Sequence, residues 1–207
     1  MAHPVALTLI RHGKTFNNER NVYQGWLDSP LLPDEIERLE RLSSFYPKPD
    51  RILSSDLQRC ADTAKRLFPD QWIELNANFR ELHFGDFEGK SHEQLKNNPA
   101  YQNWLKDPYG YAPANGESWE RFARRLQKEW QLLHAKYTPA VNEIAIFTHG
   151  GVIRFYLERF APIQKSFWEW QIPFGGGYRL VTTKERLRRN ERCTSLSEVP
   201  LTEKRNG

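Results

Sequence analysis

The chain has 207 residues, a length that suits one domain and does not exclude a compact pair. Hydrophobic residues make up 39% of it and aromatic residues 13%, which is enough for a core and excludes a globally disordered chain. The net charge of +4 lies mostly at the end, because residues 184–207 hold seven Lys and Arg against four Asp and Glu. No nucleic-acid motif accompanies this charge, so we expect no nucleic-acid partner.

Cysteine usage and the N-terminal sequence bear on the compartment. Cys60 and Cys193 lie far apart and favour a reducing environment over a disulfide framework. The first residues match neither a signal peptide nor a membrane span. We therefore expect a cytoplasmic protein without a membrane partner. Neither the cysteines nor the histidines show a metal-binding spacing, so no metal site is expected.

Apolar runs and helical periodicity alternate along the chain. The expected strands are 5–10, 51–54, 72–75, 143–147 and 178–182, and the expected helices are 34–46, 56–67, 118–136 and 151–160. Asp56 is the expected cap of the second of these helices. The alternation predicts an α/β fold, a three-layer α/β/α sandwich around a doubly wound, mostly parallel sheet.

Two segments depart from this alternation. Residues 81–116 are rich in glycine and proline, with two short helices expected at 91–97 and 100–107, and predict a helical lid over the sheet. Five aromatic residues in or beside it either line an apolar entrance or pack within the lid: Tyr101, Trp104, Tyr109, Tyr111 and Trp119. We divide the chain into a domain over residues 1–183 and a charged tail over 184–207, with a short helix at 185–192 followed by expected disorder.

The first expected strand delivers Arg11 and His12 to its carboxyl end, where α/β sheets bind their ligands. A permanent cation beside an imidazole suits attack on a phosphate ester, because the cation holds the anion while the imidazole approaches phosphorus. Such a pair taken alone is more often a surface feature. Other segments must therefore decide between the two interpretations.

Two further segments place polar groups after expected strands. Arg59 stands on the first turn of a helix and would face the same crevice as Arg11, although an exposed arginine behind an ordinary cap explains it equally well. His149 is followed by Gly150 and Gly151, which let backbone amides approach a ligand closely. A hydrogen bond from His149 to a neighbouring loop is the alternative.

Three carboxylates compete for proton transfer in the segment Phe79–Gly89. Glu81, Asp86 and Glu88 are equivalent candidates on chemistry alone. A carboxylate among the apolar side chains of this segment would have a pKa raised by desolvation, which suits a general acid. The alternative is a loop carboxylate that accepts hydrogen bonds from backbone amides.

A resemblance to the histidine phosphatase superfamily, also called the phosphoglycerate mutase-like family, is carried by five segments in order: RHGKTxxN, SSDLxR, RELHFGDFEG, NGES and THGGVIR. It covers about residues 7–183. The chain is most similar to the phosphatase branch that includes alpha-ribazole and broad-specificity phosphatases, because it is short and has Gly-Gly-Val-Ile-Arg after the second histidine where mutases usually have Gly-Asn.

The resemblance implies a role for each candidate residue. His12 would be the nucleophile that becomes phosphorylated, Glu81 the general acid and base, and His149 a hydrogen-bond donor to the phosphoryl group. Five further residues would hold the phosphoryl oxygens: Arg11, Arg59, Asn18 and, as weaker candidates, Gln24 and Gly150. Since the arginines and histidines would supply the positive charge, no metal and no cofactor is implied. Two departures from the family pattern are Lys14 in place of a glutamate and Glu35 in place of a glycine.

The expected function is that of a histidine acid-type phosphatase, which hydrolyses small phosphorylated metabolites through a phosphohistidine. The expected partner is a small phosphate monoester, and the expected state a monomer or homodimer. Two alternatives stay open at this point: a cofactor-dependent phosphoglycerate mutase and a catalytically silent binding protein.

Overall fold

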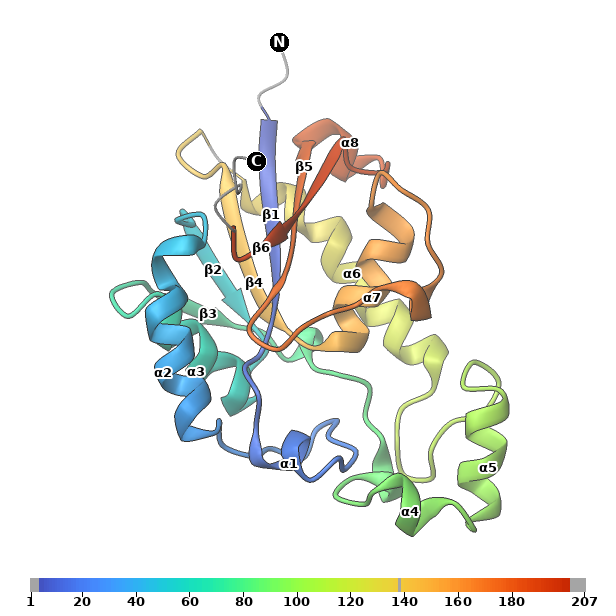
Figure 1. The fold of residues 1–207 in the computed structure, drawn as a ribbon. Helices are drawn as coiled ribbons and strands as arrows, with labels where there is room; N and C mark the ends of the chain where they lie inside the picture. The colour runs from blue at the N-terminus through green and yellow to red at the C-terminus, as the bar shows by residue number, and fades with distance from the viewer. Residues whose placement is uncertain (1–3, 138, 202–207) are drawn as a thin grey trace, which may run out of the picture.

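The computed structural model describes residues 4–137 and 139–201, which are built around one six-stranded sheet (Figure 1). The strands are β1 (Pro4–Arg11), β2 (Arg51–Ser54), β3 (Ile73–Leu75), β4 (Glu143–Thr148), β5 (Gly177–Thr183) and β6 (Ser195–Val199). Their order is β3-β2-β4-β1-β5-β6. The first four run parallel, β5 is antiparallel to β1, and β6 is antiparallel to β5. The mostly parallel sheet is confirmed.

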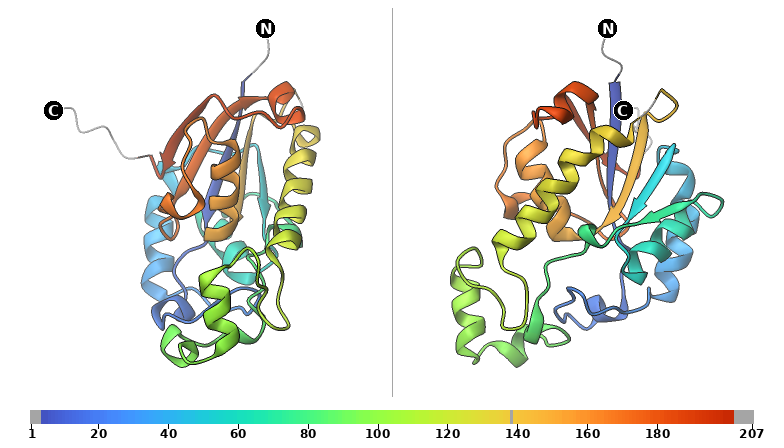
Figure 2. Two further views of the ribbon diagram at one scale, coloured as in Figure 1. Left: turned by 90° about the vertical axis from the view of Figure 1, so that its right-hand side faces the viewer. Right: turned by 180° about the vertical axis from the view of Figure 1, so that it is seen from behind.

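Helices cover both faces of this sheet, as the left view of Figure 2 shows. On one face lie α2 (Pro33–Leu42) and α3 (Gln58–Leu67), and on the other α6 (Trp119–Lys136) and α7 (Gly150–Phe160). Strand β1 contributes side chains to the packing on both faces of the sheet, because successive side chains of a strand point to opposite faces. Leu7 and Leu9 join the apolar cluster of α6 and α7, whereas Ile10 joins that of α2 and α3. The predicted three-layer sandwich is confirmed.

The segment predicted as a lid lies at the end of the molecule where the parallel strands finish (Figure 1). It contains α4 (His92–Leu95) and α5 (Pro99–Lys106), and α1 (Phe16–Glu19) lies at the same end. Fully buried Tyr101 is the centre of its packing, with its ring 5.3 to 6.0 Å from those of Phe87, Tyr23 and Trp104. Its hydroxyl lies 2.8 Å from the Tyr23 hydroxyl. These rings form the core of the lid, and they belong to the same buried cluster as the side chains of α6 and α7.

Helix α3 begins differently from the prediction. Asp56 does not cap it, because its carboxylate accepts a 2.7 Å hydrogen bond from Arg80 Nε. The amide of Gln58 at the helix start donates instead to the carboxylate of Asp28, from a distant loop. A tertiary contact has replaced the local cap. The helix predicted over 34–46 also ends early, at Leu42, and continues as a 3-10 turn over Ser43–Phe45.

The segment after residue 183 is folded as far as residue 201, and the predicted disorder is wrong there. Helix α8 (Lys184–Arg188) buries Leu187, and β6 pairs along the edge of β5. Val199 of β6 is only 3% exposed. A strand of five residues with two serines carries too little pattern to be predicted from sequence. Residues 202–207 of the predicted tail lie outside the described residues. None of the described helices is long and apolar enough to cross a membrane.

Candidate active site

The carboxyl ends of β1 and β4 bring the two candidate histidines together. The strands pair in parallel with Arg11 opposite Thr148, so His12 and His149 leave the sheet side by side. Their ring centroids lie 5.3 Å apart. His12 is 4% exposed and His149 fully buried. The ends of β1 and β4 therefore place the two imidazole rings side by side.

His12 is held as a neutral imidazole with one nitrogen free. Its Nδ1 lies 2.7 Å from the carbonyl oxygen of Gly13, so Nδ1 carries the proton and donates it. Burial, and then the charges of Arg59 and Arg11, hold the pKa of His12 well below its ordinary value. The lone pair is therefore on Nε2 at neutral pH, which is the state a nucleophile needs.

His149 is neutral as well, but its hydrogen bonds run to protein groups. Burial first, and then Arg59 and His12, hold its pKa well below the ordinary value. Nδ1 accepts from Arg59 at 3.2 Å, and Nε2 lies 3.0 Å from Ser55 Oγ. The Sγ of Cys60 lies 3.4 Å from the same Nε2. His149 thus orients Arg59 in this structure, and its direct hydrogen bond to a phosphoryl group stays a prediction.

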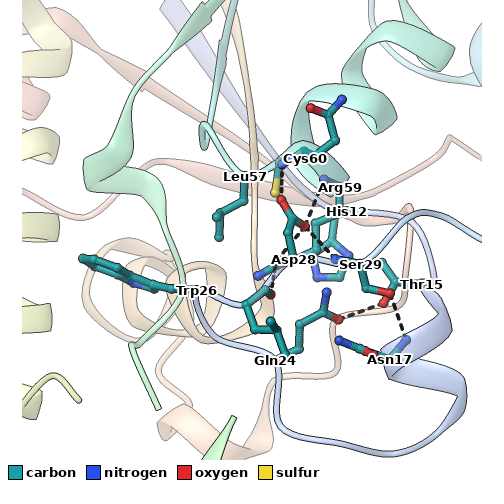
Figure 3. Close-up of polar contacts among 12 residues, drawn as sticks. His12, Thr15, Asn17, Gln24, Trp26, Asp28, Ser29, Leu57, Arg59 and Cys60 are labelled. Atoms are coloured by element: carbon teal, nitrogen blue, oxygen red, sulfur yellow. Dashed lines mark hydrogen bonds and ion pairs between the residues drawn. The ribbon is translucent and has the colours of Figure 1, made fainter. Parts of the chain in front are cut away.

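Arg59 is fully buried and holds down a loop over the site (Figure 3). We call residues 25–28 of this loop the strap. Arg59 donates to the carbonyl oxygen of Gly25 at 2.6 Å and to that of Leu27 at 3.1 Å. It also pairs with the carboxylate of Asp28 at 3.1 Å. Its Nε is buried and has no hydrogen-bond partner within the described chain. One donor of this side chain is therefore left for a ligand.

Glu88 anchors the other side of the strap. Its carboxylate accepts from the amides of Trp26 at 2.8 Å and Phe84 at 3.0 Å, and also from that of Leu27. Asp86 is exposed and accepts from the side chain of Asn115. Both carboxylates are thus engaged in loop structure. Glu81 differs from both because it lines the cavity described below and its charge acts on Arg11, the neighbour of His12.

Arg11 also offers a free donor beside His12. Its NH1 donates to the carbonyl oxygen of Ile172 at 2.7 Å, and its guanidinium lies 3.8 Å above the ring of Phe174. The buried Nε has no hydrogen-bond partner among the described residues. Burial lowers the pKa of Arg11 to about 10, with the charge of Arg154 adding to this effect. Arg11 is still a cation at neutral pH.

The predicted amide donors gather around Thr15. Its hydroxyl lies 2.9 Å from Asn18 Oδ1 and 2.8 Å from Gln24 Oε1. Because Oε1 of Gln24 is held by Thr15, the Nε2 atom of Gln24 takes a buried position. This atom has no hydrogen-bond partner in the described chain. The backbone of Gly150 begins α7, where the first amides of a helix are free for an anion. Asn18 on α1 and Gln24 on the loop after it follow β1, and Gly150 at the start of α7 follows β4.

Glu81 stands between the histidine site and a cavity under the lid. Its Oε2 accepts from the amide of Gly151 at 2.8 Å and its Oε1 from that of Leu82 at 3.0 Å. A Cβ added to Gly151 would lie 2.3 Å from Oε1, so the carboxylate needs a glycine there. The carbonyl oxygen of Glu81 in turn accepts from Arg125 at 2.8 Å and from Trp26 at 2.9 Å. Hydrogen bonds therefore fix both the carboxylate and the backbone carbonyl group of Glu81.

The cavity beside Glu81 is aromatic, and we call it the aromatic pocket. Its volume is about 310 Å³. It is lined by Tyr23, Glu81, Leu82, Phe84, Trp104, Leu105, Pro108, Tyr109, Trp119, Phe122, Gly151, Arg154, Phe167 and Trp168. Of the five aromatic residues considered from sequence, three line it, whereas Tyr101 lies in the lid core and Tyr111 is exposed.

Three site residues were missed by sequence reasoning. Asp28 gave no signal, because its pairing with Arg59 joins a loop to a helix that is distant in the sequence. Arg125 lies one place before Leu126 on the apolar face of a predicted helix, and a charge on such a face is a signal for a buried partner. Arg154 follows the His-Gly-Gly segment within one turn of α7, which puts it on the face of Gly150.

A comparison with known families identifies the family to which a chain with these site residues belongs. The model of the histidine phosphatase superfamily (branch 1) matches residues 7–194. The chain belongs to this superfamily. The adenosylcobalamin/alpha-ribazole phosphatase of Salmonella typhimurium is 28% identical over 176 residues, which cover 82% of this chain and 86% of that protein. The glucosyl-3-phosphoglycerate phosphatase of Mycolicibacterium vanbaalenii is 30% identical over 160 residues, or 71% of this chain and 70% of that protein.

A solved structure agrees in fold. The alpha-ribazole phosphatase from Shigella flexneri superposes with a TM-score of 0.83 and 24% identity, over 97% of this chain and 100% of that one. The sheet and its flanking helices therefore have the same arrangement as in that structure.

Each of the two departures from the family pattern pairs with a neighbouring side chain. Lys14 forms a 3.7 Å ion pair with Glu19, and its side chain is 41% exposed. Glu35 is buried and accepts two 2.7 Å hydrogen bonds from Arg38. Among residues 4–137 and 139–201, no three or more His, Cys, Asp or Glu side chains are grouped so that they could hold a metal ion.

Proposed function

We propose that this histidine phosphatase superfamily member is a phosphomonoesterase that works through a phosphohistidine on His12. One observation carries the proposal. A neutral histidine with a free Nε2 stands among buried donors that have no acceptor in the described protein, the Nε atoms of Arg11 and Arg59 and the Nε2 of Gln24. Buried donors without an acceptor are costly, and a phosphoryl group supplies the oxygen atoms that satisfy them.

In the first step, Nε2 of His12 attacks phosphorus while the P–O bond to the leaving group breaks. The two arginines hold non-bridging oxygens and reduce the repulsion that the nucleophile meets. Gln24, Asn18 and the amide of Gly150 add hydrogen bonds. Glu81, carrying a proton, gives it to the leaving oxygen, which departs as an alcohol.

In the second step, the carboxylate of Glu81 takes a proton from water, and the resulting hydroxide attacks the phosphohistidine. The P–N bond breaks, inorganic phosphate forms, and His12 returns to its neutral state. The water must approach from the side that the leaving group has vacated, which is the side of the aromatic pocket that Glu81 lines. One carboxylate serves both steps because both happen on the same side of phosphorus.

The aromatic pocket supports a leaving group with a flat apolar part. The Salmonella typhimurium relative is named for adenosylcobalamin and alpha-ribazole, and we propose that this chain acts on small metabolites in which the phosphate is joined to an organic group of comparable bulk. Placement among acid-type phosphatases, action in the cytoplasm and a monomeric or homodimeric state belong to the same proposal. The two free buried cysteines support the cytoplasm.

An assay of two reactions tests the proposal. Purified protein is given p-nitrophenyl phosphate and, separately, 3-phosphoglycerate, and both phosphate release and isomerisation are measured. We expect phosphate release that the His12→Asn variant loses by about 1000-fold or more. Efficient isomerisation with negligible phosphate release would point to a mutase. Equal phosphate release by the variant would contradict the role of His12.

A further inference from the structure

Arg154 lies beside the histidine site, but the catalytic steps above do not use it. It lies on α7 one turn after Gly150, and its NH1 comes within 3.7 Å of the position a Gly150 Cβ would take. The Nε and Cζ of Arg11 come within 3.6 Å of the same position. The two guanidinium groups therefore flank one glycine.

The orientation of Arg154 is fixed, and most of its donors are unused. Its Nε donates to the carbonyl oxygen of Trp170 at 3.1 Å. Its Cζ lies 6.0 Å from the ring centroids of Phe167 and Trp168. In the described part of the chain, NH1 and NH2 make no hydrogen bond, and no carboxylate lies within 4.0 Å of them. A half-buried cation without a counter-charge is suited to an oxygen of the substrate.

The surroundings of Arg154 indicate which oxygen atom of the substrate it would bind. It lines the aromatic pocket together with Glu81, the residue that handles the leaving oxygen. His12, Arg11 and Arg59 do not line this pocket. Arg154 thus stands one layer further out than the phosphoryl clamp, on the side of the leaving group.

We propose that Arg154 is a specificity-determining residue that binds an oxygen atom carried by the leaving group next to the ester bond. The proposal rests on the proposed phosphomonoesterase function and deepens it. It names the preferred substrates as phosphate esters of oxygenated alcohols, with a carboxylate attached to the ester carbon or a hydroxyl group on the next carbon, over esters of plain hydrocarbons. A carboxylate gains most, because it forms a charge-assisted pair with the guanidinium.

Three small esters of similar size separate this role from a general one. Ethyl phosphate has no neighbouring oxygen, 2-hydroxyethyl phosphate has a hydroxyl group, and phosphoglycolate has a carboxylate. The value of kcat/KM is measured for each with the wild-type protein, Arg154→Met, Arg154→Lys and the control Arg159→Met. Arg159 is an exposed arginine on the same helix, outside the pocket.

We expect Arg154→Met to lose about 100-fold on phosphoglycolate, about 10-fold on 2-hydroxyethyl phosphate and less than about 3-fold on ethyl phosphate. Arg154→Lys should recover part of the loss on phosphoglycolate, because the charge remains, and Arg159→Met should behave as wild type.

Three results would overturn the inference alone. Equal losses on all three esters would place Arg154 on the phosphoryl group, and the absence of any loss would show that it does not contact the substrate. Wild-type protein that releases phosphate from p-nitrophenyl phosphate but from none of the three esters would show that an oxygen beside the ester bond is not what the site selects. Wild-type protein that releases phosphate from none of the four compounds would instead contradict the proposed function itself, and this inference with it.

Discussion

At the scale of single residues, the neutral state of His12 and His149 has a consequence for stability. Both imidazoles are buried beside arginines, and their pKa values lie well below the ordinary value in the folded protein. The unfolded chain therefore takes up protons on these residues at a higher pH than the folded protein does. The stability that the neutral forms contribute is present above pH 6.5 and is lost as the pH falls below it.

We expect the free energy of unfolding to fall between pH 6.5 and pH 5.5 by up to about 1.4 kcal/mol for each of these histidines. Urea unfolding at a series of pH values measures the slope. The His12→Asn variant, which has one buried imidazole fewer, should show a shallower slope. A stability that does not change over this range, or a variant with the full slope, would contradict the buried neutral pair.

The contact between Glu81 and Gly151 gives a second prediction at this scale. In the Gly151→Ala variant the new methyl group would meet Oε1 of Glu81 at 2.3 Å, so the carboxylate must leave its place. We expect kcat for phosphate release to fall by about 100-fold, the lower range for a lost general acid. Thermal unfolding of the same sample checks that the fold is kept. A stable variant with unchanged kcat would show that Glu81 need not stand where the structure has it.

The sequence located His12 and Arg11 because they follow directly from a readable strand. It did not supply the partners of Arg59, since Asp28 and the two strap carbonyl groups reach it only through the fold. Residue chemistry alone left three carboxylates equivalent; the family resemblance selected Glu81, and the contacts in the structure separate it from Glu88 and Asp86. Residue types near a strand end are thus predictable, whereas their hydrogen-bond partners depend on distant loops.

At the scale of elements, the strap is held from both sides, by Arg59 and by Glu88. We expect Glu88→Ala to lower the free energy of unfolding by about 1–3 kcal/mol, because three backbone amides lose an acceptor. It should also lower kcat/KM, since the strap orients Arg59. Asp86→Ala is the matched control, an exposed carboxylate two residues away, with an expected change within about 0.5 kcal/mol.

Urea unfolding and phosphate release measured on both variants check the strap prediction. Equal effects in the two variants would mean that the strap does not depend on Glu88.

The start of α3 also depends on side chains from distant segments of the chain. The predicted cap of α3 by Asp56 failed because Arg80 binds that carboxylate, and Asp28 takes its place at the helix start.

At the scale of the whole molecule, β6 completes the sheet that the sequence predicted only up to residue 183. A chain that ends at Thr194 loses the pairing with β5 and the burial of Val199. We expect it to lose at least about 2 kcal/mol of unfolding free energy, the contribution of one fully buried valine. Urea unfolding against a chain that ends at Leu201, which keeps β6, measures the difference. Equal midpoints would mean that β6 contributes nothing to stability.

The layers and the parallel strands could be predicted because long periodic segments dominate them, and the lid because its glycines and prolines interrupt that pattern. The edge strand β6 could not, since its five residues alternate too briefly to be distinguished from a polar tail. The aromatic pocket could be predicted only in part. Its rings were visible in the sequence, but whether each one lines the pocket or packs in the lid depends on the orientation of α5 and the following loop.

The central claim is that His12 carries the phosphoryl group, and trapping that intermediate tests it most directly. The Glu81→Gln variant is mixed with p-nitrophenyl phosphate labelled at phosphorus and quenched in alkali, in which phosphohistidine survives. Because p-nitrophenolate departs without a proton, the first step proceeds, whereas the second stalls without a base. We predict label that accumulates on His12 and is absent from a variant that also carries His12→Asn. Label on another residue, or rapid release of p-nitrophenol with no label on the protein, would contradict the account.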